Sequence, residues 1–114
     1  MTKTNVKLNK GEITVFDFGG TKLHAYKTND ALCDESFLIE GTNSIVALEL
    51  PAFHENLSEF KNYIKTLSKP LTDVIISCHP SGADYFEDAK IHMAGNTVRA
   101  LGENGGIMGL IKNF

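Results

Sequence analysis

The sequence predicts a mixed fold of the α+β or α/β class, in which a run of β-hairpins is followed by αβ units. The first half alternates short β-rich runs with polar turns, a pattern typical of consecutive hairpins. The second half contains an apolar stripe at helical spacing, followed by a short apolar strand. This order favours a mixed β-sheet with helices on one face.

In the first half, residues with high β-propensity are separated by Gly19-Gly20, by a loop with Asn29 and Asp30, and by Gly41 to Ser44. Glycine, asparagine and aspartate adopt turn conformations at low cost, so each group predicts a chain reversal. The strands are expected at residues 13–18, 22–27, 36–40 and 45–49, with the polar residues 1–11 as a lead-in or an edge strand.

One helix is predicted at residues 55–68, between Pro51 and Pro70. Its apolar residues are spaced by three or four positions and therefore share one face; they are Leu57, Phe60, Ile64 and Leu67. Residues 73–77 are almost continuously apolar, which predicts a strand covered on both faces.

The last third of the chain is predicted to alternate short helices with one more strand. A helical turn is expected at residues 81–87 with Ser81 as its N-cap, because serine accepts backbone hydrogen bonds at helix starts. A strand is expected at residues 90–93, and short helical segments are expected between residues 96 and 112.

Length and charge limit the classes of function. A chain of 114 residues predicts a single domain, residues 1–114. The net charge is −3 and the lysines are scattered, which argues against a nucleic-acid partner because such binding needs clustered positive charge. No apolar stretch is long enough to span a membrane, and Cys33 and Cys78 match no metal-binding spacing. We therefore expect a cytoplasmic protein with reduced thiols and without a membrane partner.

Several segments together resemble the N-terminal half of the metallo-β-lactamase superfamily. They are the strand pair 36–41 and 45–49, the helical stripe that begins at Leu57, and the strand that runs from Val74 into Ser77-Cys78-His79. The resemblance implies half of the αββα sandwich of that family. It also implies that the loop after the strand occupies the place of a Thr-His-x-His-x-Asp-His motif, which binds zinc in the family.

In this loop the motif is degenerate. His79 matches the first histidine, whereas Ser81, Ala83 and Asp84 stand where the family has His, Asp and His. The family often has Asp-Thr-Gly where this chain has Glu49-Leu50-Pro51. The resemblance thus implies His79 and Asp84 as the remaining candidate metal ligands, with His54 as a third.

Catalytic zinc typically has three protein ligands and one bound water. We therefore expect no catalytic metal centre in this chain alone and no resident cofactor, and we identify no catalytic residue. The expected role is binding or assembly, or a lost hydrolase activity. The alternative is a metal-dependent hydrolase with zinc or iron in an atypical or subunit-shared site around His79.

The resemblance to half of a sandwich also implies a partner. A half-fold leaves one sheet face without a covering layer, and exposed apolar faces of that kind mark interfaces. We therefore expect a homo-oligomer, most simply a two-fold dimer that covers the open sheet face.

A further alternative is a phosphate-binding fragment. Asp17-Phe18-Gly19-Gly20-Thr21-Lys22 resembles the first phosphate motif of sugar kinases in the actin-like ATPase group, where aspartate handles the metal and backbone amides approach phosphate. An ordinary hairpin turn accounts for the same residues. His24 and His92 fall within predicted strands and are expected to be plain sheet residues.

Overall fold

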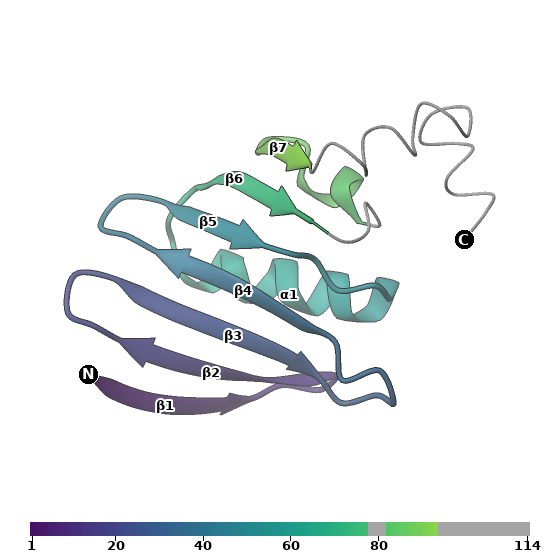
Figure 1. The fold of residues 1–114 in the computed structure, drawn as a ribbon, viewed down its shortest axis with the longest axis horizontal. Helices are drawn as coiled ribbons and strands as arrows, with labels where there is room; N and C mark the ends of the chain where they lie inside the picture. Colours follow the sequence, from purple (N-terminus) through teal and green to yellow (C-terminus); the bar gives the residue numbers. More distant parts are fainter. Residues whose placement is uncertain (78–81, 94–114) are drawn as a thin grey trace.

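The computed structural model describes residues 1–77 and 82–93, which form one seven-stranded sheet in the order β1-β2-β3-β4-β5-β6-β7 (Figure 1). Strands β1 to β5 form an antiparallel meander, and β6 and β7 add in parallel. The mixed sheet predicted from the sequence is thus confirmed. The strands are β1 (Thr2–Lys7), β2 (Gly11–Asp17), β3 (Lys22–Thr28), β4 (Glu35–Glu40), β5 (Ile45–Leu48), β6 (Leu71–Ile76) and β7 (Lys90–Met93).

Two helical elements lie on the same side of this sheet. The helix α1 (His54–Thr66) connects β5 to β6, and the 3₁₀ turn η1 (Ala83–Phe86) connects β6 to β7. In Figure 1, α1 lies behind the sheet, so the opposite sheet face is turned toward the viewer. Glu55 in the first turn and Lys65 in the last turn of α1 match the sign of the helix dipole at each end.

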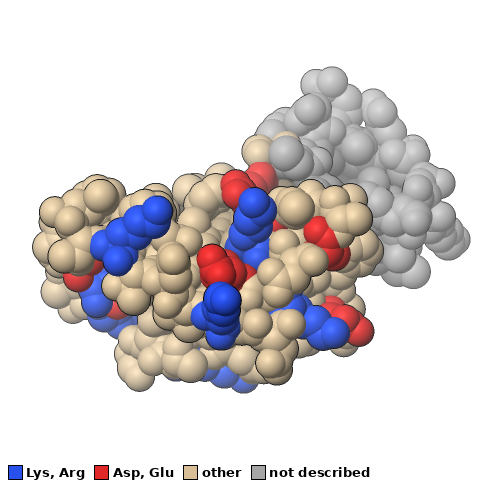
Figure 2. Space-filling view, turned by 90° about the horizontal axis from the view of Figure 1, so that it is seen from below, with Lys and Arg blue, Asp and Glu red and all other residues tan. Residues whose placement is uncertain are grey.

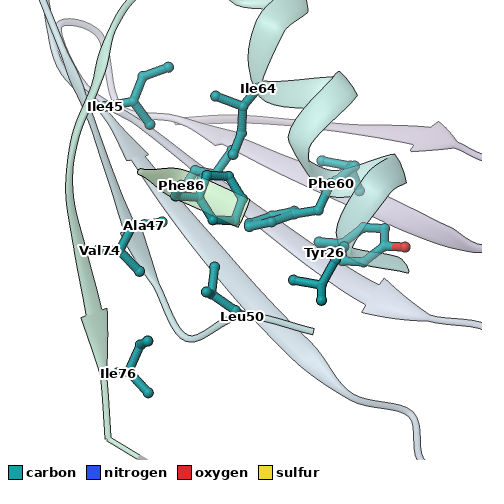
Figure 3. Close-up of a cluster of buried hydrophobic side chains, with 12 residues drawn as sticks. Tyr26, Ile45, Ala47, Leu50, Phe60, Ile64, Val74, Ile76 and Phe86 are labelled. Carbon is teal, nitrogen blue, oxygen red and sulfur yellow. The ribbon is translucent and has the colours of Figure 1, made fainter. Parts of the chain in front are cut away.

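The core lies between α1 and the sheet. Leu57, Phe60 and Ile64 of the predicted helical stripe are all buried, and Phe60 packs against the Tyr26 ring with centroids 5.4 Å apart (Figure 3). The sheet contributes the alternate residues that point toward the helix, and η1 contributes Phe86. The buried apolar residues are Ile13, Tyr26, Leu38, Ile45, Ala47, Leu50, Leu57, Phe60, Ile64, Val74, Ile76 and Phe86.

The other sheet face carries a second set of apolar side chains. In the register of the strands, Phe16, Leu23, Ile39 and Val46 follow one another across β2 to β5. Within residues 1–77 and 82–93, α1 and η1 both pack on the opposite side, and Ile39 is 39% and Ile75 43% exposed. We call this surface the open face; its apolar residues are Phe16, Leu23, Ala25, Phe37, Ile39, Val46, Leu48 and Ile75.

The expectation that residues 73–77 form a strand covered on both faces is wrong. In β6, Val74 and Ile76 are buried under the helical layer, but Ile75 between them points to the open face. Successive side chains of a strand point to opposite faces, and only one face has a helical layer among the described residues. The segments predicted between residues 96 and 112, and Ser81, lie outside the described residues; Gly82 is the residue that precedes η1.

Candidate functional site

The predicted site lies where β5 and β6 end, and Glu49 organises this region. Glu49 follows β5 in a left-handed conformation with φ of 61°. Its amide donates to the Ile75 carbonyl at 2.8 Å, and its carboxylate accepts hydrogen bonds from the Ser77 amide and the Ser77 hydroxyl, both at 2.6 Å. For a residue other than glycine, this backbone conformation costs about 1–2 kcal/mol. Glu49 therefore fixes the point at which the chain leaves β6.

The chain is fixed again at Gly82, on the other side of residues 78–81. Gly82 has φ of 89°, and a Cβ atom there would lie only 2.5 Å from Cδ2 of Leu57 in α1. Only glycine fits this close approach to the helix. His79 and Cys78 themselves lie outside the described residues, so the structure gives their flanks and not their positions.

The other two candidate ligands lie at η1, on the Gly82 side of residues 78–81. His54 is exposed at the start of α1, and its ring meets Tyr85 edge-on, with Nε2 3.4 Å from the Tyr85 hydroxyl. Asp84 precedes Tyr85 and is exposed on η1. Among residues 1–77 and 82–93, no group of three or more His, Cys, Asp or Glu side chains could hold a metal ion. His54 and Asp84 alone do not supply the ligands that a catalytic zinc needs.

A buried polar cluster under α1 was missed by sequence reasoning. His24 on β3 is 2% exposed; its Nδ1 lies 2.6 Å from the Tyr63 hydroxyl and its Nε2 2.8 Å from Glu40 Oε1. Lys69 donates to Glu40 Oε2 at 2.6 Å and to the Gly41 carbonyl at 2.9 Å. We call His24, Glu40, Tyr63 and Lys69 the His24 network; it ties β3, β4, α1 and the segment before β6 together.

The hydrogen bonds assign protons within the His24 network. A carboxylate only accepts, so His24 donates from Nε2 to Glu40 and, when neutral, accepts from Tyr63 at Nδ1. Burial alone would raise the pKa of Glu40, but the hydrogen bonds from Lys69 and His24 outweigh it and hold the pKa below its usual 4.5. Burial raises the pKa of Tyr63 to about 12, so this phenol stays protonated at neutral pH.

One sequence signal could have found this network. His24 and Glu40 occupy strand positions with the same alternation as the core residues Tyr26 and Leu38, so they had to point toward the helix. Buried charged groups need partners. Tyr26, two residues after His24 on the same side of β3, also has a polar partner: its hydroxyl donates to Glu59 at 2.9 Å. His24 does lie in a strand, as expected. The expectation that it is a plain sheet residue is wrong, because its side chain is buried in a polar cluster.

The phosphate-motif residues form a hairpin turn between β2 and β3. The Phe18 amide donates to the Thr21 carbonyl at 2.9 Å, and Asp17 Oδ1 accepts from the Gly19 amide at 2.9 Å. Gly19 has φ of 98°, which glycine adopts readily. The Asp17 carboxylate thus stabilises its own turn, and residues 18–21 are exposed.

On the side of the molecule seen in Figure 2, Lys side chains lie next to acidic side chains, so this side has no patch of a single charge sign. Within the described part of the chain, no helix is long and apolar enough to cross a membrane.

No protein-family model matches the sequence, and no curated protein matches it.

Proposed function

We propose that this chain is an assembly module with a metallo-β-lactamase-like half-fold, whose open face binds a second β-layer. The observation that carries the proposal is the open face itself. Ile39 and Ile75 lie 39% and 43% exposed among six further apolar residues on five adjacent strands. The other six are half-buried, and apolar side chains that adjoin one another across five strands are typical of an interaction surface.

The half-fold part of the proposal is supported by two features. The five-stranded meander followed by the α1 crossover has the order that the resemblance implies. Glu49 stands where the family often has aspartate, and its carboxylate holds the chain at Ser77, just before the degenerate motif. An assembly role needs no catalytic centre, which agrees with the loss of three of the four motif residues.

Dye binding tests the assembly role. Ile39→Lys places a charge in the middle of the open face, where the side chain can still reach solvent in the isolated chain. Asn62→Lys adds the same charge on an exposed position of α1 and serves as the matched control. We expect anilinonaphthalene sulfonate fluorescence per chain to rise on dilution of the wild type and of the control. For Ile39→Lys we expect it not to change on dilution and to stay below that of the diluted wild type. A monomeric wild type that binds no more dye than Ile39→Lys contradicts the proposal.

The second candidate function is a metal-dependent hydrolase with an atypical or subunit-shared site around His79. The observation that favours it is the left-handed conformation of Glu49 beside the end of β6, because strained residues cluster at functional sites. Metal analysis of protein purified without chelator tests it. Stoichiometric zinc or iron that is lost in His79→Ala and kept in His92→Ala supports the hydrolase; no metal, or equal metal in both variants, refutes it.

A further inference from the structure

The open face is arranged symmetrically about the central strand. In the seven-stranded order, β4 has three strands on each side. The apolar residues of the open face lie on β2 to β6, with Phe37 and Ile39 on β4 itself. The outermost strands present polar side chains on this face: Lys3, Asn5 and Lys7 on β1, and Lys90 and His92 on β7.

This distribution is that of a protein interface with an apolar centre and a polar rim. Rim groups already have partners within the chain: His92 Nε2 lies 2.7 Å from Asp73 Oδ2, and the Lys3 ammonium lies 5.8 Å from the centroid of the Phe16 ring. The lysines of the rim have acidic neighbours on the next strands: Glu12 on β2 is opposite Lys7, and Asp73 on β6 is opposite Lys90. The face therefore does not require a strongly acidic or strongly basic partner.

The size of the open face suits a dimer. Strands spaced about 4.8 Å apart, with a rise of about 3.3 Å per residue, give a seven-stranded face of roughly 600–700 Å². Stable interfaces bury about 800 Å² on each partner. A layer of the same width and strand length would cover the face completely, and a second copy of this chain is such a layer.

We propose that the open face binds the open face of a second copy, with the two-fold axis lying between the two sheets, over β4. This inference rests on the proposed assembly function and names its partner. A two-fold axis that lies between the sheets, over the central strand, brings the apolar centre of one copy against that of the other and leaves both polar rims at the edge, as an isologous interface requires. The two sheets then pack face to face about 10 Å apart, with α1 on the outside of each copy.

Mass measurement and site-specific cross-linking of the full chain test this geometry. Sedimentation equilibrium over a concentration series should give a dimer for the wild type. Ile39→Lys should raise the dimer dissociation constant about 100-fold, while Asn62→Lys leaves it unchanged. A photoreactive benzoylphenylalanine in place of Ile39 should give a covalent dimer on illumination, and the same group in place of Asn62 should not.

The remaining outcomes separate this inference from the proposed function. A dimer that persists in Ile39→Lys, or that cross-links from position 62 and not from position 39, overturns the proposed dimer. A monomeric wild type with dye binding that Ile39→Lys removes also overturns it, but leaves assembly with another partner standing. A monomeric wild type whose photoreactive group at position 39 cross-links to residues 94–114 of the same chain overturns both proposals.

Discussion

The two faces of the sheet are made by the same strands, but they differ in the layer that covers them and in their polar contacts. On β4, Leu38 and Glu40 are buried under α1, while Ile39 between them is 39% exposed. The covered face combines apolar packing with the His24 network, whose hydrogen bonds fix α1 in one position. The open face is apolar at its centre. Directional bonds specify one partner element within the chain, whereas an apolar surface accepts any layer of matching shape.

Neighbouring isoleucines in β6 provide the largest expected contrast. Ile76→Ala should destabilise the fold by about 3 kcal/mol, because Ile76 is 1% exposed and its loss leaves a cavity. Ile75→Ala should cost less than about 1 kcal/mol in dilute protein, because Ile75 is 43% exposed. Urea denaturation of both variants measures the contrast. Equal losses in dilute protein would mean that Ile75 is covered within the single chain.

The polar part of the covered face gives the next effect. Glu40→Ala should destabilise the fold by about 3 kcal/mol, because it leaves the His24 Nε2–H and the Lys69 ammonium without their shared acceptor. Glu35→Ala, on the same strand and exposed on the open-face side, should change stability by less than about 0.5 kcal/mol. If the two variants are equally stable in urea, the His24 network does not contribute to folding.

Acid should weaken the covered face in a defined direction. Because Lys69 and His24 hold the pKa of Glu40 below its usual 4.5, the folded state binds this proton less readily than the unfolded chain. The stabilisation is therefore complete above the unfolded pKa and is lost as the pH falls through the folded pKa. Thermal melts from about pH 3 to about pH 7 should show the wild type and Glu40→Gln converging at acid pH. Parallel curves would contradict this assignment.

The smallest effect is expected at Glu49, where β5 and β6 end. Glu49→Ala should cost about 1 kcal/mol, because it removes the charge-assisted bonds to Ser77 and keeps the left-handed backbone. Hydrogen exchange of the Ser77 amide should become faster. Glu49→Gly should recover part of the lost stability, since glycine adopts this conformation without strain, but should not restore amide protection. Unchanged exchange in both variants would show that Glu49 does not hold this segment.

Much of the fold could be predicted because its signals are local. The strand at residues 36–40, observed as β4 (Glu35–Glu40), and the helix at residues 55–68, observed as α1 (His54–Thr66), follow from side-chain periodicity and turn residues a few positions apart. The candidate site could be predicted only in outline. His54 and Asp84 both lie at η1, which follows residues 78–81, yet the role of Glu49 depends on a bond to a residue 28 positions away.

The sequence by itself determined the strands, the helix and the alternation of side chains along them, because each depends on the steric preferences of near neighbours. The tertiary structure decided which side of that alternation is covered. It also decided that His24 meets Tyr63, 39 positions away, and that Glu40 meets Lys69, 29 positions away. Such contacts depend on where α1 returns across the sheet. The same alternating pattern in β4 therefore became a buried network on one side and an open face on the other.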